Sequence, residues 1–207
     1  MVKIGVLISG GGSNLQALID KVKVGEIKGD IRLIISNNKG AYGIARGRKA
    51  GIESIYIDPK EFENMEEYNR RLIEEFKKRK IDLIVLAGFL KILSKEFIST
   101  FRNRIINIHP SLIPSFCGKG HYGERVHRKV LDYGCKITGA TVHFVDEGTD
   151  TGPIILQEAV RVEEGDTVES LGKKVLKVEH RLLPEAVKLF CDNRIVLRGR
   201  KTIIKQE

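Results

Sequence analysis

The chain has 207 residues, 42% hydrophobic and 30% charged, a composition typical of a globular protein whose core needs no disulfide or metal. Three cysteines without a CxxC pair argue against a disulfide framework or zinc site, and no apolar run approaches the roughly 20 residues of a membrane span. The net charge of +9 favours anionic partners without choosing among nucleic acids, phosphorylated metabolites and polyglutamate tails. The opening residues lack the features of a signal peptide, so we expect a cytoplasmic protein.

Five short apolar runs rich in β-branched residues alternate with amphipathic segments along the first half of the chain. The runs predict strands at residues 3–9, 31–36, 54–58, 82–88 and 104–108. The segments between them predict helices near residues 13–25, 41–50, 61–79 and 94–101. Continuous hydrophobicity indicates strands covered on both faces. The sequence therefore predicts an open, mostly parallel, Rossmann-like α/β sheet with helices on both faces.

The pattern changes from about residue 136. Two apolar runs, 136–145 and 152–162, follow each other through a polar loop and predict an antiparallel C-terminal strand pair. A long helix is expected at 167–191, and residues 194–205 resemble a terminal hairpin. Because no linker is long enough to separate two domains, we expect a single domain over residues 1–207.

The segment ISGGGSNLQALI places three glycines between the first predicted strand and a helix. Glycines allow close backbone approach to a ligand, and a helix N-terminus offers N–H groups to an anion, so we expect this loop to cradle a phosphate. Ser13 or Asn14 is expected to cap the helix. A P-loop would need a lysine that is absent, and a dinucleotide fingerprint would need glycine where Leu15 stands, which argues against a nucleotide-binding oxidoreductase. A tight turn without a ligand is the remaining alternative.

Asn107 and His109 stand at the end of the fifth predicted strand, in NIHPSLIP. Residues two apart in an extended strand point to the same side. Pro110 favours extended geometry at His109, and Pro114 restricts the loop that follows. An amide donor beside a titratable imidazole suits oxyanion stabilisation and proton transfer.

The acidic loop in FVDEGTDTGPI offers this pair a carboxylate partner, from Asp146, Glu147 or Asp150. A carboxylate beside an imidazole raises the imidazole pKa and holds its tautomer. A solvated turn and a divalent-ion site are alternatives, but the spacing does not fit a calcium loop and no His/Cys cluster accompanies it. His143, in the preceding run, is expected to be a strand residue with a hydrogen-bonded ring.

Four blocks, LISGGGSNLQALI, LAGFLKILS, NIHPSLIPSF and GATVHFVDEGTDTGPIILQ, closely resemble the phosphoribosylglycinamide formyltransferases of the folate-dependent formyltransferase family. The resemblance extends from Lys3 to about Phe190. It implies formyl transfer from 10-formyltetrahydrofolate to the amine of glycinamide ribonucleotide in purine biosynthesis, without a metal. It also implies a phosphate- and nucleotide-binding half at 1–100 and a catalytic and folate-binding half at 101–207.

The resemblance implies a role for each matched position. The catalytic residues are Asn107, His109 and Asp150. The residues that bind the ribonucleotide are Gly11, Gly12, Ser13, Asn14 and Glu179. The residues that contact the folate are Met65, Leu90, Lys91, Ile92, Leu93, Asn107, Asp146 and Asp150.

The same resemblance implies a mechanism and marks two departures. Asn107 and a protonated His109 stabilise the oxyanion, while Asp150 raises the pKa of the histidine and keeps it charged near neutral pH. Met65 and Lys91 stand where some members carry arginine, so a contact with the folate carboxylates comes from elsewhere or lacks the bidentate geometry of arginine.

Other classes remain as alternatives. A methionyl-tRNA formyltransferase is expected to carry a further C-terminal domain, for which 207 residues leave no room, and a formyltetrahydrofolate deformylase typically adds an N-terminal domain, whereas the predicted sheet begins at residue 3. A basic nucleic-acid-binding protein would need aromatic platforms, but aromatics are 6% and Trp is absent. We therefore expect small-molecule substrates and no nucleic-acid or membrane partner, with a homodimer as the candidate assembly.

Overall fold

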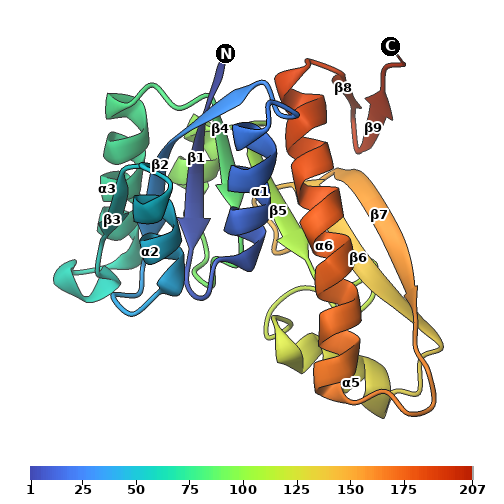
Figure 1. The fold of residues 1–207 in the computed structure, drawn as a ribbon. Coiled ribbons are helices and arrows are strands. Elements are labelled where there is room, and N and C mark those ends of the chain that lie inside the picture. The colour runs from blue at the N-terminus through green and yellow to red at the C-terminus, as the bar shows by residue number, and fades with distance from the viewer. Residues whose placement is uncertain (207) are drawn as a thin grey trace. The chain divides into compact units, whose positions relative to one another are not determined.

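The computed structural model describes residues 1–206, which form two compact units that meet in the chain between Ile106 and Asn107. Strand β5 (Ile105–His109) carries the chain from the first unit into the second. Figure 1 follows the chain by colour through both. The expected single domain stays a prediction, as does its division into a nucleotide-binding half at 1–100 and a catalytic and folate-binding half at 101–207.

The first unit contains parallel strands joined by helical crossovers. Its strands before β5 are β1 (Val2–Ile8), β2 (Gly29–Ser36), β3 (Ser54–Tyr56) and β4 (Leu83–Leu86). They lie in the order β3-β2-β1-β4, with every pairing parallel, as predicted. The helical segments are α1 (Ser13–Lys23), α2 (Tyr42–Lys49), the 3-10 helix η1 (Pro59–Glu61), α3 (Met65–Lys78) and α4 (Lys95–Thr100).

The predicted helix at 61–79 begins later than expected. Its cap is Asn64, whose side chain accepts a hydrogen bond from the backbone N–H of Glu67. The residues before the cap form η1, which starts at Pro59 because proline fits the first helical position. The strong start signal of Asn64 therefore outweighs the helix-favouring residues that precede it.

Strand β1 lies at the topological switch point, between β2 and β4. The chain builds the sheet from β1 toward β3 and then returns past β1 to add β4. Because parallel crossovers are right-handed, the helices before and after this reversal cover opposite faces of the sheet. Accordingly, α1 contacts α2, while α3 contacts α4. The ends of β1 and β4 lie side by side, with the N–H of Ser9 donating to the Gly88 carbonyl at 3.1 Å. Ligands of open α/β sheets bind at such a point.

An aromatic cluster fills the α3 and α4 side of the first unit. Phe76 and Phe97 are fully buried, and Phe101 packs against both at ring-centroid distances of 6.0 and 5.1 Å. A Cβ atom on Gly5 of β1 would lie 2.5 Å from the Phe76 ring. Glycine at this position therefore lets the aromatic layer pack directly on the sheet.

The second unit contains antiparallel strands and two helices. Its strands after β5 are β6 (Ile137–Phe144), β7 (Ile154–Arg161), β8 (Ile195–Arg198) and β9 (Lys201–Ile204), in the order β6-β7-β9-β8. The antiparallel pairing of β6 with β7 and the β8–β9 hairpin confirm the predictions. The parallel contact of β7 with β9 was not predicted.

The helices of this unit are α5 (Glu124–Asp132) and α6 (Val168–Cys191). Helix α6 confirms the predicted long helix and packs on β6 and β7 (Figure 1). Helix α5 was not predicted, because a glycine-rich segment precedes it and it has a short apolar face of Val126 and Val130. Within residues 1–206, no helix combines the length and apolar character needed to cross a membrane.

Candidate active site

Strand β5 places Asn107 and His109 on one side of the sheet. Ile108, between them, points to the other side and is buried. His109 is 4% exposed, and Asn107 is half-buried. The strand thus holds an amide and an imidazole next to each other, as the sequence predicts.

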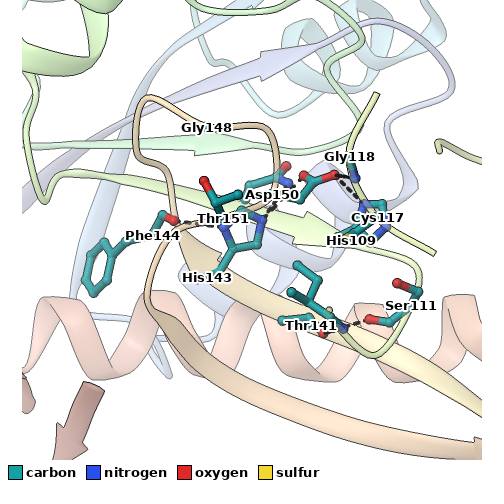
Figure 2. A network of polar contacts seen from close by, with 12 residues as sticks. His109, Ser111, Cys117, Gly118, Thr141, His143, Phe144, Gly148, Asp150 and Thr151 are labelled. Carbon is teal, nitrogen blue, oxygen red and sulfur yellow. Dashed lines mark hydrogen bonds and ion pairs between the residues drawn. The ribbon is translucent and has the colours of Figure 1, made fainter. Parts of the chain in front are cut away.

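Thr141 of β6 holds the loop that follows β5. Its buried hydroxyl donates to the carbonyl of Ser111 at 2.6 Å (Figure 2) and accepts from the backbone N–H of Ile113 at 3.1 Å. The side chain of Gln157 on β7 donates to the same hydroxyl at 2.9 Å. One hydroxyl therefore fixes the chain immediately after His109 to the neighbouring strand.

Asp150 lies in the loop between β6 and β7, in a left-handed backbone conformation with φ of 59°. The loop is closed by Asp146, whose carboxylate accepts from the N–H of Gly148 at 3.2 Å and from the hydroxyl of Thr151 at 2.5 Å. Aspartate tolerates this backbone region better than most residues. The carboxylate of Asp146 therefore stabilises the loop, whereas the carboxylate of Asp150 points toward His109 and His143.

The carboxylate of Asp150 lies between two histidines. Its Oδ2 atom accepts from the N–H of Gly118 at 2.9 Å and lies 3.5 Å from Nδ1 of His109. Its Oδ1 atom lies 3.7 Å from Nε2 of His143 (Figure 2). Asn107 reaches the same group, since its Nδ2 lies 3.1 Å from Nε2 of His143. The structure thus brings together Asn107, His109 and Asp150, and adds His143 to them.

Burial dominates the protonation of His109. Burial lowers the pKa of the imidazole below its ordinary value of 6.5, although the charge of Asp150 and the carbonyl of Phe116 both raise it. The contribution of Asp150 to the pKa thus has the expected direction. The expectation that His109 stays charged near neutral pH is wrong for this resting site, because the lost hydration of the charged ring outweighs the attraction of one carboxylate.

Asp150 itself is held as a carboxylate. Burial raises its pKa, but the adjacent ring of His143, the charge of His109 and the N–H of Gly118 together lower it, and the net pKa lies below the ordinary value of 3.8. A negative charge therefore faces two ring nitrogens near neutral pH. This arrangement favours proton uptake at His109 when negative charge develops nearby.

His143 is the residue whose role the sequence interpretation missed. Its place in strand β6 is confirmed, and its Nδ1 lies 2.8 Å from the carbonyl oxygen of Phe144. An ionisable side chain inside a buried strand, shortly before the loop that carries Asp150, is the signal that could have indicated it.

In the first unit, the glycine loop leads into α1 without a side-chain cap. Gly12 is the N-cap, with φ of 69°, and neither Ser13 nor Asn14 caps the helix, contrary to expectation. Ser13 already belongs to the helix, one position too late to cap it. The backbone at the start of α1 is therefore available to hold an anion.

Helix α2 supports this loop through two residues that the sequence interpretation missed. A Cβ atom on Gly12 would lie 2.7 Å from the Cα of Gly43, whose N–H donates to the Gly10 carbonyl at 3.1 Å. Arg46 donates from Nε to the carbonyl of Gly11 at 2.9 Å. A glycine at position 43, inside a predicted helix, is the sequence signal for this close approach.

Ser9 connects the loops at the carboxyl ends of the strands. Its hydroxyl accepts from the N–H of Leu90 at 2.8 Å and donates to the side chain of Asn37 at 2.6 Å. Leu90 and Ile92 are 58% and 70% exposed, whereas Leu93 is buried. The segment after β4 thus presents two apolar side chains on a backbone that Ser9 fixes.

The structure gives the position and exposure of the other predicted site residues, and their contacts with ligands stay predictions. Met65 begins α3 and is partly exposed, and Lys91 is exposed in the loop after β4. Glu179 is 8% exposed in α6. Among residues 1–206, no group of three or more His, Cys, Asp or Glu side chains is arranged to hold a metal ion.

Comparisons with known proteins agree with the resemblance in the motifs. A family model described as Formyl transferase matches residues 2–187. Phosphoribosylglycinamide formyltransferase of Escherichia coli is 42% identical over 194 residues, which cover 94% of this chain and 89% of that protein. The trifunctional purine biosynthetic protein adenosine-3 of Gallus gallus is 44% identical over 197 residues, and the chain spans 19% of its length.

A solved structure gives the same result for the fold. Glycinamide ribonucleotide transformylase 1 from Symbiobacterium toebii matches with a TM-score of 0.95 and 44% identity, covering 100% of this chain and 95% of that one. Both the α/β fold and the sequence match extend over nearly the whole chain. The chain therefore belongs to the formyl transferase family, among its phosphoribosylglycinamide formyltransferases.

Proposed function

We propose that this protein transfers the formyl group of 10-formyltetrahydrofolate to the amine of glycinamide ribonucleotide, giving the N-formyl product and tetrahydrofolate in purine biosynthesis. The observation that carries the proposal is the buried group in which the carboxylate of Asp150 faces His109 at 3.5 Å, beside the amide of Asn107. The names of its relatives support the substrates.

The proposed reaction is a direct transfer. The free amine attacks the formyl carbon, a C–N bond forms and the carbonyl electron pair moves to oxygen, which gives an oxyanion and a positively charged amine. The amine loses a proton, the oxyanion collapses to a carbonyl, and the bond from carbon to N10 of the folate breaks as N10 takes up a proton. Atoms and charge balance without an oxidant or reductant.

His109 and Asp150 suit the proton transfers of this sequence. In the resting site Nε2 of His109 lies 3.0 Å from the carbonyl oxygen of Phe116, so this nitrogen carries the hydrogen and Nδ1 faces Asp150 with a lone pair. A proton taken up at Nδ1 is stabilised by the adjacent carboxylate. The imidazolium formed in this way stabilises the oxyanion together with an N–H of Asn107.

The first unit supplies features that suit the two ligands. The uncapped start of α1 after Gly11 and Gly12 suits the phosphate of the ribonucleotide, because backbone N–H groups and the helix dipole favour an anion. The exposed side chains of Leu90 and Ile92 suit the flat, largely apolar ring system of a folate. Glu179 is assigned to the ribose hydroxyls as an acceptor.

The decisive experiment follows formyl transfer by absorbance in wild type, His109→Ala and Asp150→Asn. We expect wild-type turnover that requires both ligands, and losses of about 10²–10⁴-fold in each variant. Asp132→Asn, an exposed change on α5, is the matched control and keeps full activity. Folate turnover that ignores the ribonucleotide would indicate a deformylase, and no turnover in the wild type would overturn the proposal.

The cytoplasmic location and the homodimer also belong to this proposal. Cell fractionation tests the first, and light scattering over a range of protein concentrations tests the second. A mass of one chain, 23.3 kDa, at every concentration would exclude the dimer.

A further inference from the structure

The ring of His143 has a defined partner at each nitrogen, and the side chain is 2% exposed. Nδ1 lies 2.8 Å from the carbonyl oxygen of Phe144. A carbonyl oxygen only accepts hydrogen bonds, so Nδ1 carries a hydrogen. The tautomer of the ring is therefore decided by the backbone of its own strand.

The second nitrogen, Nε2, lies 3.1 Å from Nδ2 of Asn107. An amide nitrogen only donates, so Nε2 must accept and the ring is neutral with its hydrogen on Nδ1. The carboxylate of Asp150, at 3.7 Å from Nε2, lies beyond hydrogen-bond distance. The amide of Asn107 is therefore the hydrogen-bond partner of this nitrogen.

We propose that His143 is a positioning residue that fixes the orientation of the Asn107 carboxamide. By accepting one Nδ2–H, it leaves the second Nδ2–H for the developing oxyanion. Without this acceptor the amide can rotate by half a turn and present Oδ1, which repels an oxyanion. The catalytic part of this inference rests on the proposed function, whereas the hydrogen-bond part does not.

The hydrogen-bond part is tested by nuclear magnetic resonance on the ligand-free protein. Long-range ¹⁵N–¹H correlations of the histidine rings report which nitrogen carries the hydrogen. We expect the neutral Nδ1–H form for His143 in the wild type near neutral pH. A hydrogen on Nε2 in the wild type would overturn the proposal whether or not the enzyme transfers formyl groups.

The variant Asn107→Asp sharpens this measurement, because it replaces the donating amide by an accepting carboxylate of the same shape. We expect His143 to gain a hydrogen at Nε2 in this variant. His127, another buried histidine, which lies on α5, is the internal reference and keeps its wild-type signals. An unchanged His143 spectrum in a folded Asn107→Asp protein would contradict the contact.

The catalytic part is tested by a double-mutant cycle. Loss of an oxyanion donor costs about 10²–10³ in kcat, so we expect His143→Ala to lower kcat by about 10–100-fold with little change in KM. In an Asn107→Ala background the same change should cost less than about threefold, because the residue acts through Asn107. His143→Gln, which keeps an acceptor, should recover part of the loss.

Two outcomes separate this inference from the proposed function. Equal losses from His143→Ala with and without Asn107 would show that His143 acts independently, and would overturn the inference. If the wild type shows no formyl transfer, the proposed function fails, but the resonance result still decides the hydrogen bond. Urea unfolding of each variant identifies losses that come from an unfolded protein.

Discussion

The carboxylate of Asp150 and the imidazole of His109 lie 3.5 Å apart, and the carboxylate raises a histidine pKa that burial lowers. Asp150→Asn removes this charge, so that the lowering of the His109 pKa by burial is no longer opposed by the carboxylate. We expect the pKa of His109 to fall further below 6.5 in the variant, because the imidazolium loses its nearest counter-charge.

The measurement is a resonance titration of the ring protons of His109 in both proteins. Asp132→Asn, which removes an exposed charge on α5, is the control and leaves the titration unchanged. A titration midpoint that stays constant or rises in Asp150→Asn would show that the carboxylate does not act on this ring.

Two buried histidines make the stability depend on pH. Burial lowers the pKa of both His109 and His127 below 6.5, so at pH values between the folded pKa and 6.5 the unfolded chain binds more protons than the folded one. The free energy of unfolding therefore reaches its full value above 6.5. It decreases as the pH falls through the folded pKa values.

This dependence is measured as the urea midpoint at about pH 7.5 and about pH 5.5. His127→Gln should reduce the difference between the two midpoints, and the double variant with His109→Gln should reduce it further. If both variants keep the wild-type difference, other groups cause the pH dependence.

The glycine loop before α1 should respond differently at neighbouring positions. Gly12→Ala puts a side chain on a backbone with φ of 69° and at 2.7 Å from Gly43, so we expect a loss of about 1–3 kcal/mol in the free energy of unfolding. Gly11→Ala meets no atom within 4 Å and should change it by less than about 0.5 kcal/mol. Urea unfolding distinguishes the two, and equal effects would contradict the packing of α2 on the loop.

Thr141 offers a test of the support behind His109. Thr141→Val removes the hydroxyl and leaves the partly buried N–H of Ile113 without its partner, which should cost about 1–3 kcal/mol. Thr141→Ser keeps the hydroxyl and should lie close to the wild type. Urea midpoints of the two variants give the comparison, and a Ser variant as unstable as the Val variant would assign the effect to the lost methyl group.

Much of the fold follows from local patterns in the sequence. The continuous apolar runs of β1, β2 and β4 are typical of strands covered on both faces, and the structure confirms them. The alternate placement of Asn107 and His109 on one strand was likewise predictable, because side-chain direction in a strand has a period of two.

The features that sequence patterns did not reveal depend on distant contacts. The charge state of His109 is set by a balance between burial and the attraction of Asp150, and neither magnitude can be obtained from local sequence. The partners of His143 come from another strand and from its own backbone. Helix α5 is short and owes its stability to packing rather than to a strong local signal.

The left-handed backbone at Asp150 also limits how this position can vary through evolution. Glycine, asparagine and aspartate adopt such a conformation most readily, and among them aspartate alone brings a negative charge. Glutamate, the usual charge-conserving exchange, has a longer side chain and a less compatible backbone preference. Aspartate is thus the one amino acid that provides both the negative charge and the left-handed turn. Every substitution at position 150 therefore loses the charge or disfavours the turn.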